Sequence, residues 1–197
     1  MGFWDDLGRS LSQSMELDHQ RKMMELQQIG VALQFARNKY NFGEFQAALA
    51  AYEQALAMAQ INGSPELQAT ILTEMGNTYK KTNQLDRALQ AYNQGLEVAR
   101  KYEDLARLHN QIGVLYDASG EAQKAFESYQ KALSINLGNK QRGLKRTILR
   151  NAGLSSEELG NYQQARNYLT ETLNLAQKLG DKDSQNELKD FIERLPE

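Results

Sequence analysis

The sequence contains no cysteine and, among its 197 residues, only two prolines and two histidines. The missing cysteine excludes a disulfide framework and leaves a zinc site without its commonest ligands. The scarcity of proline removes the main helix breaker, and abundant Ala, Leu, Gln and Glu favour helices over strands. We therefore predict an all-α chain that holds no metal and no other cofactor.

Long apolar runs and a strong net charge are missing as well. No stretch of about 18 apolar residues is present, so we expect no segment that spans a membrane. The opening MGFWDDLGRSLSQS has no basic segment followed by an apolar one, so we expect no secretory signal and a cytoplasmic protein. With 23 basic and 25 acidic residues, the composition disfavours nucleic acid as a partner.

The motifs that carry common enzyme chemistry are absent too. The sequence has no G-x-x-x-x-G-K-[ST], no G-x-S-x-G and no H-E-x-x-H. His19 and His109 have no partner at metal-ligand spacing. We therefore predict that the protein is not an enzyme.

An internal repeat dominates what is present. Four similar segments follow one another at offsets of 40, 37 and 40 residues: ALAAYEQAL (48–56), ALQAYNQGL (88–96), AFESYQKAL (125–133) and ARNYLTETL (165–173). A period of this length is typical of stacked helical repeats. The apolar positions within each segment form one stripe that a single unit could not bury alone.

Each unit is predicted to consist of two helices joined by a tight turn. Small residues in the first helix let the second approach closely: Ala36, Gly76, Gly113 and Gly153. Seven residues further on are types that tolerate a left-handed helix end: Gly43, Asn83, Gly120 and Gly160. The predicted units cover residues 29–62, 66–101, 104–138 and 141–179.

These residues resemble the tetratricopeptide repeat family, most clearly through Gly76, Tyr79, Ala88 and Tyr92 and their equivalents in the next unit. The long period is similar to the extended repeats of kinesin light chain, and the resemblance covers about residues 29–180. It implies a right-handed superhelical solenoid of four helix-turn-helix repeats. Residues 181–197 carry Leu188, Phe191, Ile192 and Leu195 on one face, which predicts a C-terminal capping helix.

The family resemblance also implies where a ligand binds, because the first helix of each repeat lines a concave groove. The corresponding positions here are Arg37, Tyr40, Asn77, Lys80, Lys81, Arg107, Asn110, Gln111, Arg150 and Asn151. Asn can pair with a ligand backbone, and Arg grips a carboxylate with two donors. We therefore expect a non-enzymatic scaffold or adaptor that binds an acidic peptide or protein segment in this groove.

Basic residues are concentrated in one stretch. Residues 128–156 carry six basic side chains and no acidic one, and Arg142, Arg146 and Arg150 follow each other at intervals of four with Lys145 beside them. Like charges at this spacing repel. The stripe is therefore balanced either by acids of a neighbouring helix, such as Asp117 or Glu121, or by an external anion.

Residues 1–28 precede the repeats and leave two interpretations open. Phe3, Leu7, Leu11 and Met15 recur every four residues, with the only tryptophan, Trp4, beside them. The first interpretation is a helix folded back to cap the first repeat. The second is an interfacial helix in which Phe3, Trp4, Leu7 and Leu11 contact a membrane or a partner, which would make the protein a peripheral membrane-associated assembly or tethering factor. The sequence does not predict the oligomeric state.

Overall fold

The computed structural model describes residues 2–196, and of Phe3, Asp5 and Asp6 it describes the backbone alone. All regular structure in these residues is helical, which confirms the all-α prediction. The elements are α1 (Phe3–Asn41), α2 (Phe45–Asn62), α3 (Pro65–Lys81), α4 (Leu85–Val98), α5 (Tyr102–Ala118), α6 (Ala122–Ser134), the short 3-10 helix η1 (Asn139–Gln141), α7 (Arg142–Glu158), α8 (Tyr162–Leu179) and α9 (Lys182–Arg194).

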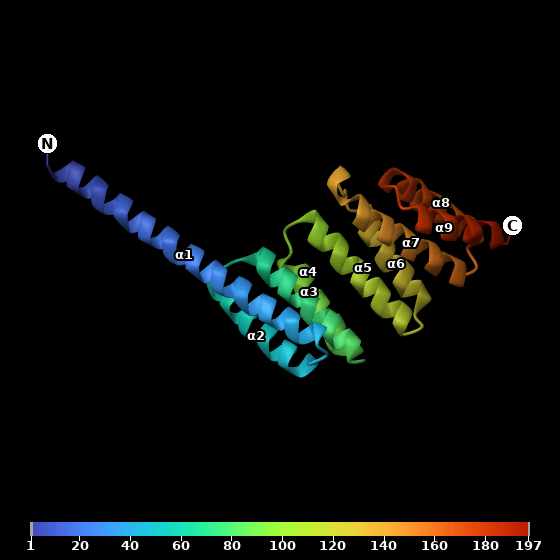
Figure 1. Ribbon diagram of the computed structural model, residues 1–197, viewed down its shortest axis with the longest axis horizontal. Helices are drawn as coiled ribbons and strands as arrows, with labels where there is room; N and C mark the ends of the chain where they lie inside the picture. Colours follow the sequence, from blue (N-terminus) through green and yellow to red (C-terminus); the bar gives the residue numbers. More distant parts are fainter. Residues whose placement is uncertain (1, 197) are drawn as a thin grey trace.

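The helices form consecutive antiparallel pairs that stack in one direction (Figure 1). The pairs are α1–α2, α3–α4, α5–α6 and α7–α8, and α9 packs on α8 at the C-terminal end. Across the stack, α3 also contacts α5 and α5 contacts α7, so the first helices of successive pairs share one face. We call it the first-helix face.

The turns inside the pairs depend on four residues with positive φ. These are Gly43 (77°), Asn83 (58°), Gly120 (72°) and Gly160 (75°). The left-handed conformation costs a residue with a Cβ about 1–2 kcal/mol, which explains three glycines and one asparagine at these places. The sequence prediction for these turns is confirmed.

Close packing inside the pairs depends on the small residues of the first helices. A Cβ on Gly76 would stand 2.3 Å from Cε1 of Tyr92, and one on Gly113 would stand 2.5 Å from Cε1 of Tyr129. Both tyrosines are almost fully buried, as is Ala36 in the first pair. The rings therefore occupy the space that a larger residue would need, as the sequence pattern predicts.

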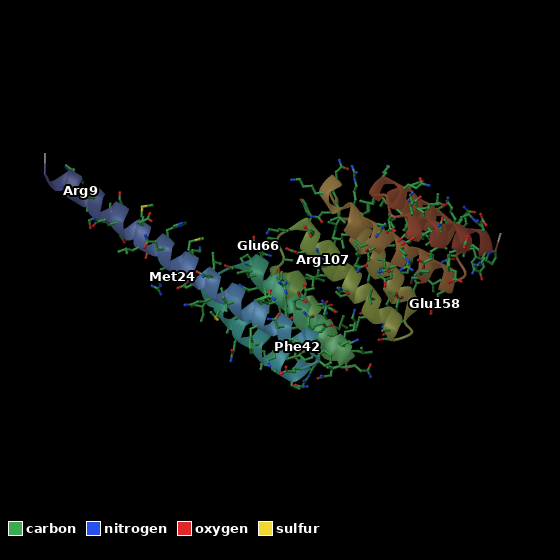
Figure 2. All side chains as sticks on the ribbon, in the orientation of Figure 1. Arg9, Met24, Phe42, Glu66, Arg107 and Glu158 are labelled. Carbon is green, nitrogen blue, oxygen red and sulfur yellow. The ribbon has the colours of Figure 1, made fainter. Side chains whose placement is uncertain are left out.

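The N-terminal region differs from the expectation of a helix folded back as a cap. Residues 3–41 form one continuous helix, because no proline interrupts it and no residue before Gly43 among those described has a positive φ to make a turn. The Nδ2 group of Asn62, the last residue of α2, donates to Glu25 of α1 (2.9 Å). The helix α2 therefore ends beside Glu25. In Figure 2 Arg9 lies on the part of α1 that projects beyond the other helices. We call residues 3–23 the overhang.

The C-terminal end carries the expected capping helix. Leu188 and Leu195 are buried, and Phe191 and Ile192 pack beside them against α8. Asp181 caps the N-terminus of α9 by accepting from the backbone N–H of Ser184 (3.1 Å). Arg166 of α8 donates to the carbonyl oxygens of Ile192 and Leu195, both at 2.9 Å, and so holds the other end.

Candidate binding groove

A pocket of about 440 Å³ opens on the first-helix face, where α1, α3 and α5 meet. Five of the groove residues expected from the sequence line it together with one that was not expected, Glu74. The lining is Tyr40, Glu74, Asn77, Lys80, Lys81 and Gln111. Glu74 lies about one helical turn before Asn77 on α3, so the spacing of the predicted residues could have indicated it.

Lys80 is the distinctive group of this pocket. Its ammonium is half-buried, and burial lowers the pKa of Lys80 below the usual value for lysine. Its Nζ donates to the amide oxygen of Gln111 at 3.4 Å, and within residues 2–196 it forms no ion pair. The pocket therefore holds a partly desolvated cation whose hydrogen-bond partner among the described residues is a neutral amide.

Asn77 is held in one orientation beside Lys80. The hydroxyl of Tyr92 donates to its Oδ1 at 2.8 Å. Burial raises the pKa of Tyr92 far above its usual range, so that hydroxyl keeps its proton. This bond orients the amide, and Asn77 can donate its Nδ2 hydrogens in the pocket.

The arginines expected in the groove each bind a carboxylate of this chain. Arg37 donates to Glu74 through Nε (3.1 Å) and Nη2 (2.9 Å). Arg107 donates to Glu103 at 2.7 Å, one turn away on the same helix. Arg150 pairs with Glu187 of α9 at 2.8 Å. Their charges are therefore offset internally, which the sequence pattern did not show.

The basic stripe is balanced by acids of the next elements. Lys145 pairs with Glu171 (2.7 Å) and Arg146 with Asp181 (2.6 Å), while Arg142 is exposed. The expected partners were wrong, because each is engaged elsewhere. Asp117 accepts from the hydroxyl of Tyr129, and Glu121 pairs with Lys124 of the following helix.

Two further groove residues bond to each other. The Nδ2 group of Asn151 on α7 donates to Oδ1 of Asn110 on α5 at 3.0 Å, and Asn110 is buried. This bond links two successive units across the first-helix face. The structure thus brings Tyr40, Asn77, Lys80, Lys81 and Gln111 into one pocket and uses the remaining groove residues in contacts within the chain.

The residues proposed for an interface with a membrane or a partner lie on the overhang. Trp4, Leu7 and Leu11 are exposed there, while the side chain of Phe3 lies outside the described residues. None of the described helices combines the length and the apolar character that crossing a membrane requires. In the described part of the chain, no three His, Cys, Asp or Glu side chains converge as a metal site would need.

Paired helices stacked around a shared first-helix face define a helical repeat protein. A large side chain is buried in each second helix: Tyr52, Tyr92, Tyr129 and, in the fourth pair, Leu169. The model of the tetratricopeptide repeat matches residues 28–101, 67–138 and 104–178. The chain therefore belongs to the tetratricopeptide repeat family, and the resemblance drawn from the sequence is confirmed. The family consists typically of scaffolds that act through protein–protein interaction.

Solved structures show the same fold. The crystal structure of BtubC (BKLC) from P. vanneervenii superposes with a TM-score of 0.68 at 24% identity, covering 78% of this chain and 65% of that one. MamA (41 to the end) from Desulfovibrio magneticus RS-1 gives a TM-score of 0.58 at 18% identity over 76% of both chains. These likenesses show the fold of the chain.

A curated relative matches part of the chain. Outer dynein arm-docking complex subunit 4 of Danio rerio is 28% identical over 119 residues, which is 59% of this chain. The match covers 24% of that relative, so this chain spans only about a quarter of its length.

Proposed function

We propose that the protein is a non-enzymatic adaptor that binds an acidic segment of a protein partner along the first-helix face, with the pocket around Lys80 as its anchor. The observation that carries this proposal is the half-buried Lys80 ammonium, which has an amide oxygen as its contact in the pocket. A ligand carboxylate that approaches it would find a cation already stripped of part of its water.

The rest of the pocket supports this chemistry. Glu74 is neutralised by Arg37, so Lys80 and Lys81 give the pocket a positive balance. Asn77 offers donors for a backbone carbonyl of the ligand, and Tyr40 offers an apolar ring edge. The acidic preference thus depends on the two lysines. Arg37, Arg107 and Arg150 would first have to release their own carboxylates.

The curated relative favours an assembly role. Its name describes a subunit of a docking complex, and an adaptor that holds one protein on another is of that kind. The shared region comprises repeats, so the proposal transfers only the general activity of holding a protein segment.

A peptide-display selection tests the proposal. Random peptides are selected on the wild type, and the enriched sequences are titrated by calorimetry against three proteins: the wild type, Lys80→Met and Lys131→Met. Lys80→Met keeps the apolar stem and removes the charge, while Lys131 is an exposed lysine of α6 outside the pocket. We expect enrichment of Asp and Glu, a loss of about tenfold in affinity for Lys80→Met, and no loss for Lys131→Met, since a charge-assisted bond contributes about 1.5–3 kcal/mol. Enriched peptides without acidic residues, or equal affinities for all three proteins, would contradict it.

A further inference from the structure

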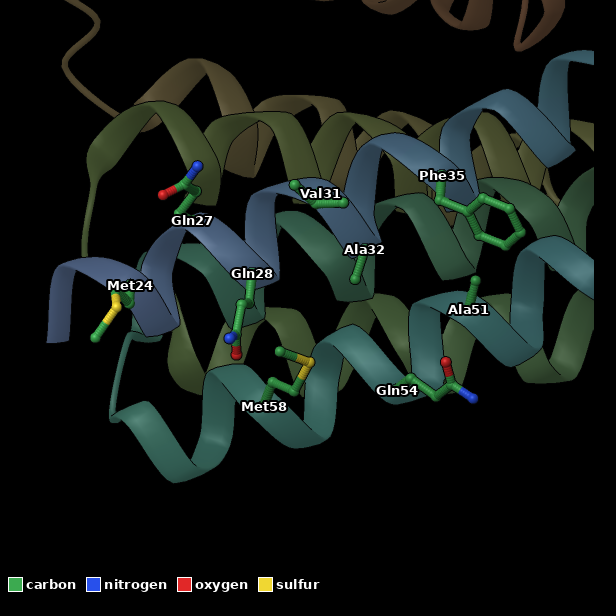
Figure 3. A pocket seen from close by; sticks show the side chains of 9 residues that line it. All are labelled: Met24, Gln27, Gln28, Val31, Ala32, Phe35, Ala51, Gln54 and Met58. Carbon is green, nitrogen blue, oxygen red and sulfur yellow. The ribbon is translucent and has the colours of Figure 1, made fainter. Parts of the chain in front are cut away.

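An apolar groove of about 650 Å³ lies between α1 and α2, on the side away from α3. Figure 3 shows Met24, Val31 and Phe35 of α1 above Ala51 and Met58 of α2. The full lining is Met24, Gln27, Gln28, Val31, Ala32, Phe35, Ala51, Gln54 and Met58. Val31 is 65% exposed and Phe35 53% exposed, which is unusual for large apolar residues that line a shared groove.

The repeat explains what this groove resembles. Forty residues further along the chain, Val31, Phe35 and Ala51 correspond to Ile71, Met75 and Ala91. These three belong to the core cluster in which α3 packs against both α2 and α4. In the next unit this surface is covered by α2, the second helix of the unit before it. The groove is the equivalent surface of the first unit, and none of the described segments covers it in the same way.

The overhang is a helix that needs a packing partner. Trp4, Leu7, Leu11 and Leu17 are exposed on it, with Leu7 at 40% and Leu17 at 65%. An isolated helix of about 20 residues is only marginally stable in water, so most of its stability must come from packing of an apolar face.

The overhang and the groove lie on one continuous seam of α1. Leu7, Leu17, Met24, Val31 and Phe35 all occur at the two apolar positions of a single heptad frame. Between Leu7 and Phe35, the remaining seam positions are polar: Ser10, Ser14, Arg21 and Gln28. A 3.5-residue apolar period along a helix is typical of packing against a second long helix.

We propose that the groove and the overhang bind a second copy of this chain, with the two α1 helices antiparallel and the overhang of each lying in the groove of the other. Leu7 then lies opposite Val31 of the second copy, and the twofold axis passes near residue 19. In this register residues 3–14 of one copy lie along Met24–Phe35 of the other. The overhang of each copy therefore covers the groove of the other, and both apolar surfaces are buried in both copies.

The flanking positions agree with this arrangement. Trp4 and Leu11 occupy the same heptad position as Glu25 and Ala32, because all four are separated by multiples of seven residues. Glu25 and Ala32 lie on the side of α1 that contacts α2. In an antiparallel pair these positions lie on the same side of both helices. Trp4 and Leu11 of one copy therefore lie toward α2 of the other, where Ala51 and Met58 complete the groove.

Charge distinguishes the antiparallel arrangement from a parallel one. Parallel pairing in register would place Arg21 beside Arg21 within the seam. Arg21 already pairs with Glu25 of its own helix (3.2 Å). Antiparallel pairing places Leu17 and Asp18 of the second copy beside Arg21, so it adds an acid rather than a second base. Parallel pairing would also set overhang on overhang and leave each groove without a helix.

Sedimentation and tryptophan emission test the association on the full chain. We expect a species of twice the chain mass of 22.3 kDa. The emission of Trp4, the only tryptophan, should shift to longer wavelength on dilution as the pair separates. Val31→Glu should give a monomer with the red-shifted emission at all concentrations. Ile61→Glu, which changes an apolar residue 88% exposed on α2 outside the groove, should remain a dimer. Circular dichroism verifies that both variants fold.

Cysteine cross-linking tests the register, since the chain has no cysteine of its own. Mixing Leu7→Cys with Val31→Cys should give a disulfide-linked dimer, whereas Leu7→Cys alone should not, because antiparallel α1 helices hold the two Leu7 positions far apart. Efficient cross-linking of Leu7→Cys alone would overturn the antiparallel arrangement. A monomeric wild type would overturn the proposal, including the case in which Trp4 emission shifts only when anionic phospholipid vesicles are added.

Discussion

The ring of Tyr92 fills the space above Gly76, where an added Cβ would stand 2.3 Å from Cε1, 2.5 Å from Cδ1 and 2.8 Å from Cζ of the ring. The ring cannot move aside easily, because Tyr92 is fully buried and its hydroxyl is bound to Asn77. The hairpin of α3 and α4 therefore depends on the absence of a side chain at one position.

Gly76→Ala should lower the free energy of unfolding by about 1–3 kcal/mol, since overpacking of a filled core outweighs the gain of about 1 kcal/mol in helix propensity. Chemical denaturation monitored by circular dichroism measures the change. The matched control is Gly143→Ala on α7, where an added Cβ would meet no atom within 4 Å. It should be neutral or stabilising, and an equal loss in both variants would refute the packing argument.

The half-buried His109 should make the stability depend on pH. Burial, with a smaller contribution from Lys131, lowers the pKa of His109 below its ordinary 6.5. Below pH 6.5 the unfolded chain therefore binds more protons than the folded one, and stability falls as the pH drops through this range. Melting temperatures measured from neutral to acidic pH should show the decline.

His109→Leu should weaken this part of the pH dependence, because the equivalent residues Leu72 and Leu149 are buried apolar side chains. His19→Gln, a change at an exposed position of the overhang, should keep the behaviour of the wild type. A pH profile that is the same in His109→Leu and in the wild type would show that another group is responsible.

Arg166→Met should loosen the C-terminal helix. The change removes the donors to the carbonyl oxygens of Ile192 and Leu195. It should lower the free energy of local opening of α9 by about 1–2 kcal/mol, which raises the opening equilibrium constant roughly tenfold. Hydrogen exchange of the amides of α9 measures the effect. Arg142→Met, at an exposed position of α7, is the control, and unchanged protection of α9 in Arg166→Met would show that apolar packing alone holds it.

The sequence predicted the parts of the fold that each residue determines through its own chemistry. Gly120 and Asn83 indicate left-handed turns, and Gly113 indicates a close helix contact, because few other residues can occupy such places. The course of residues 3–28 was harder to predict, since an amphipathic stripe suits a folded-back helix and a projecting one equally well.

The candidate site could be predicted only in part, because charges act through neighbours that are distant in sequence. Lys80, Lys81 and Gln111 were identified from their places in the repeat. The partners of Arg146 and Arg150 could not be, since Asp181 and Glu187 lie about one repeat further along the chain. Locating them needs the position of residues 181–194 relative to α7, which the pattern of apolar residues does not determine.

The polar contacts between units share one property. Arg37 with Glu74 and Arg150 with Glu187 are 37 residues apart, Arg146 with Asp181 35 and Asn110 with Asn151 41, so each contact spans about one repeat. Each unit is therefore coupled only to its neighbours, as in a one-dimensional Ising chain. Such an array should unfold from its ends as the temperature rises. The pocket around Lys80, between the second and third units, should therefore be among the last parts to unfold.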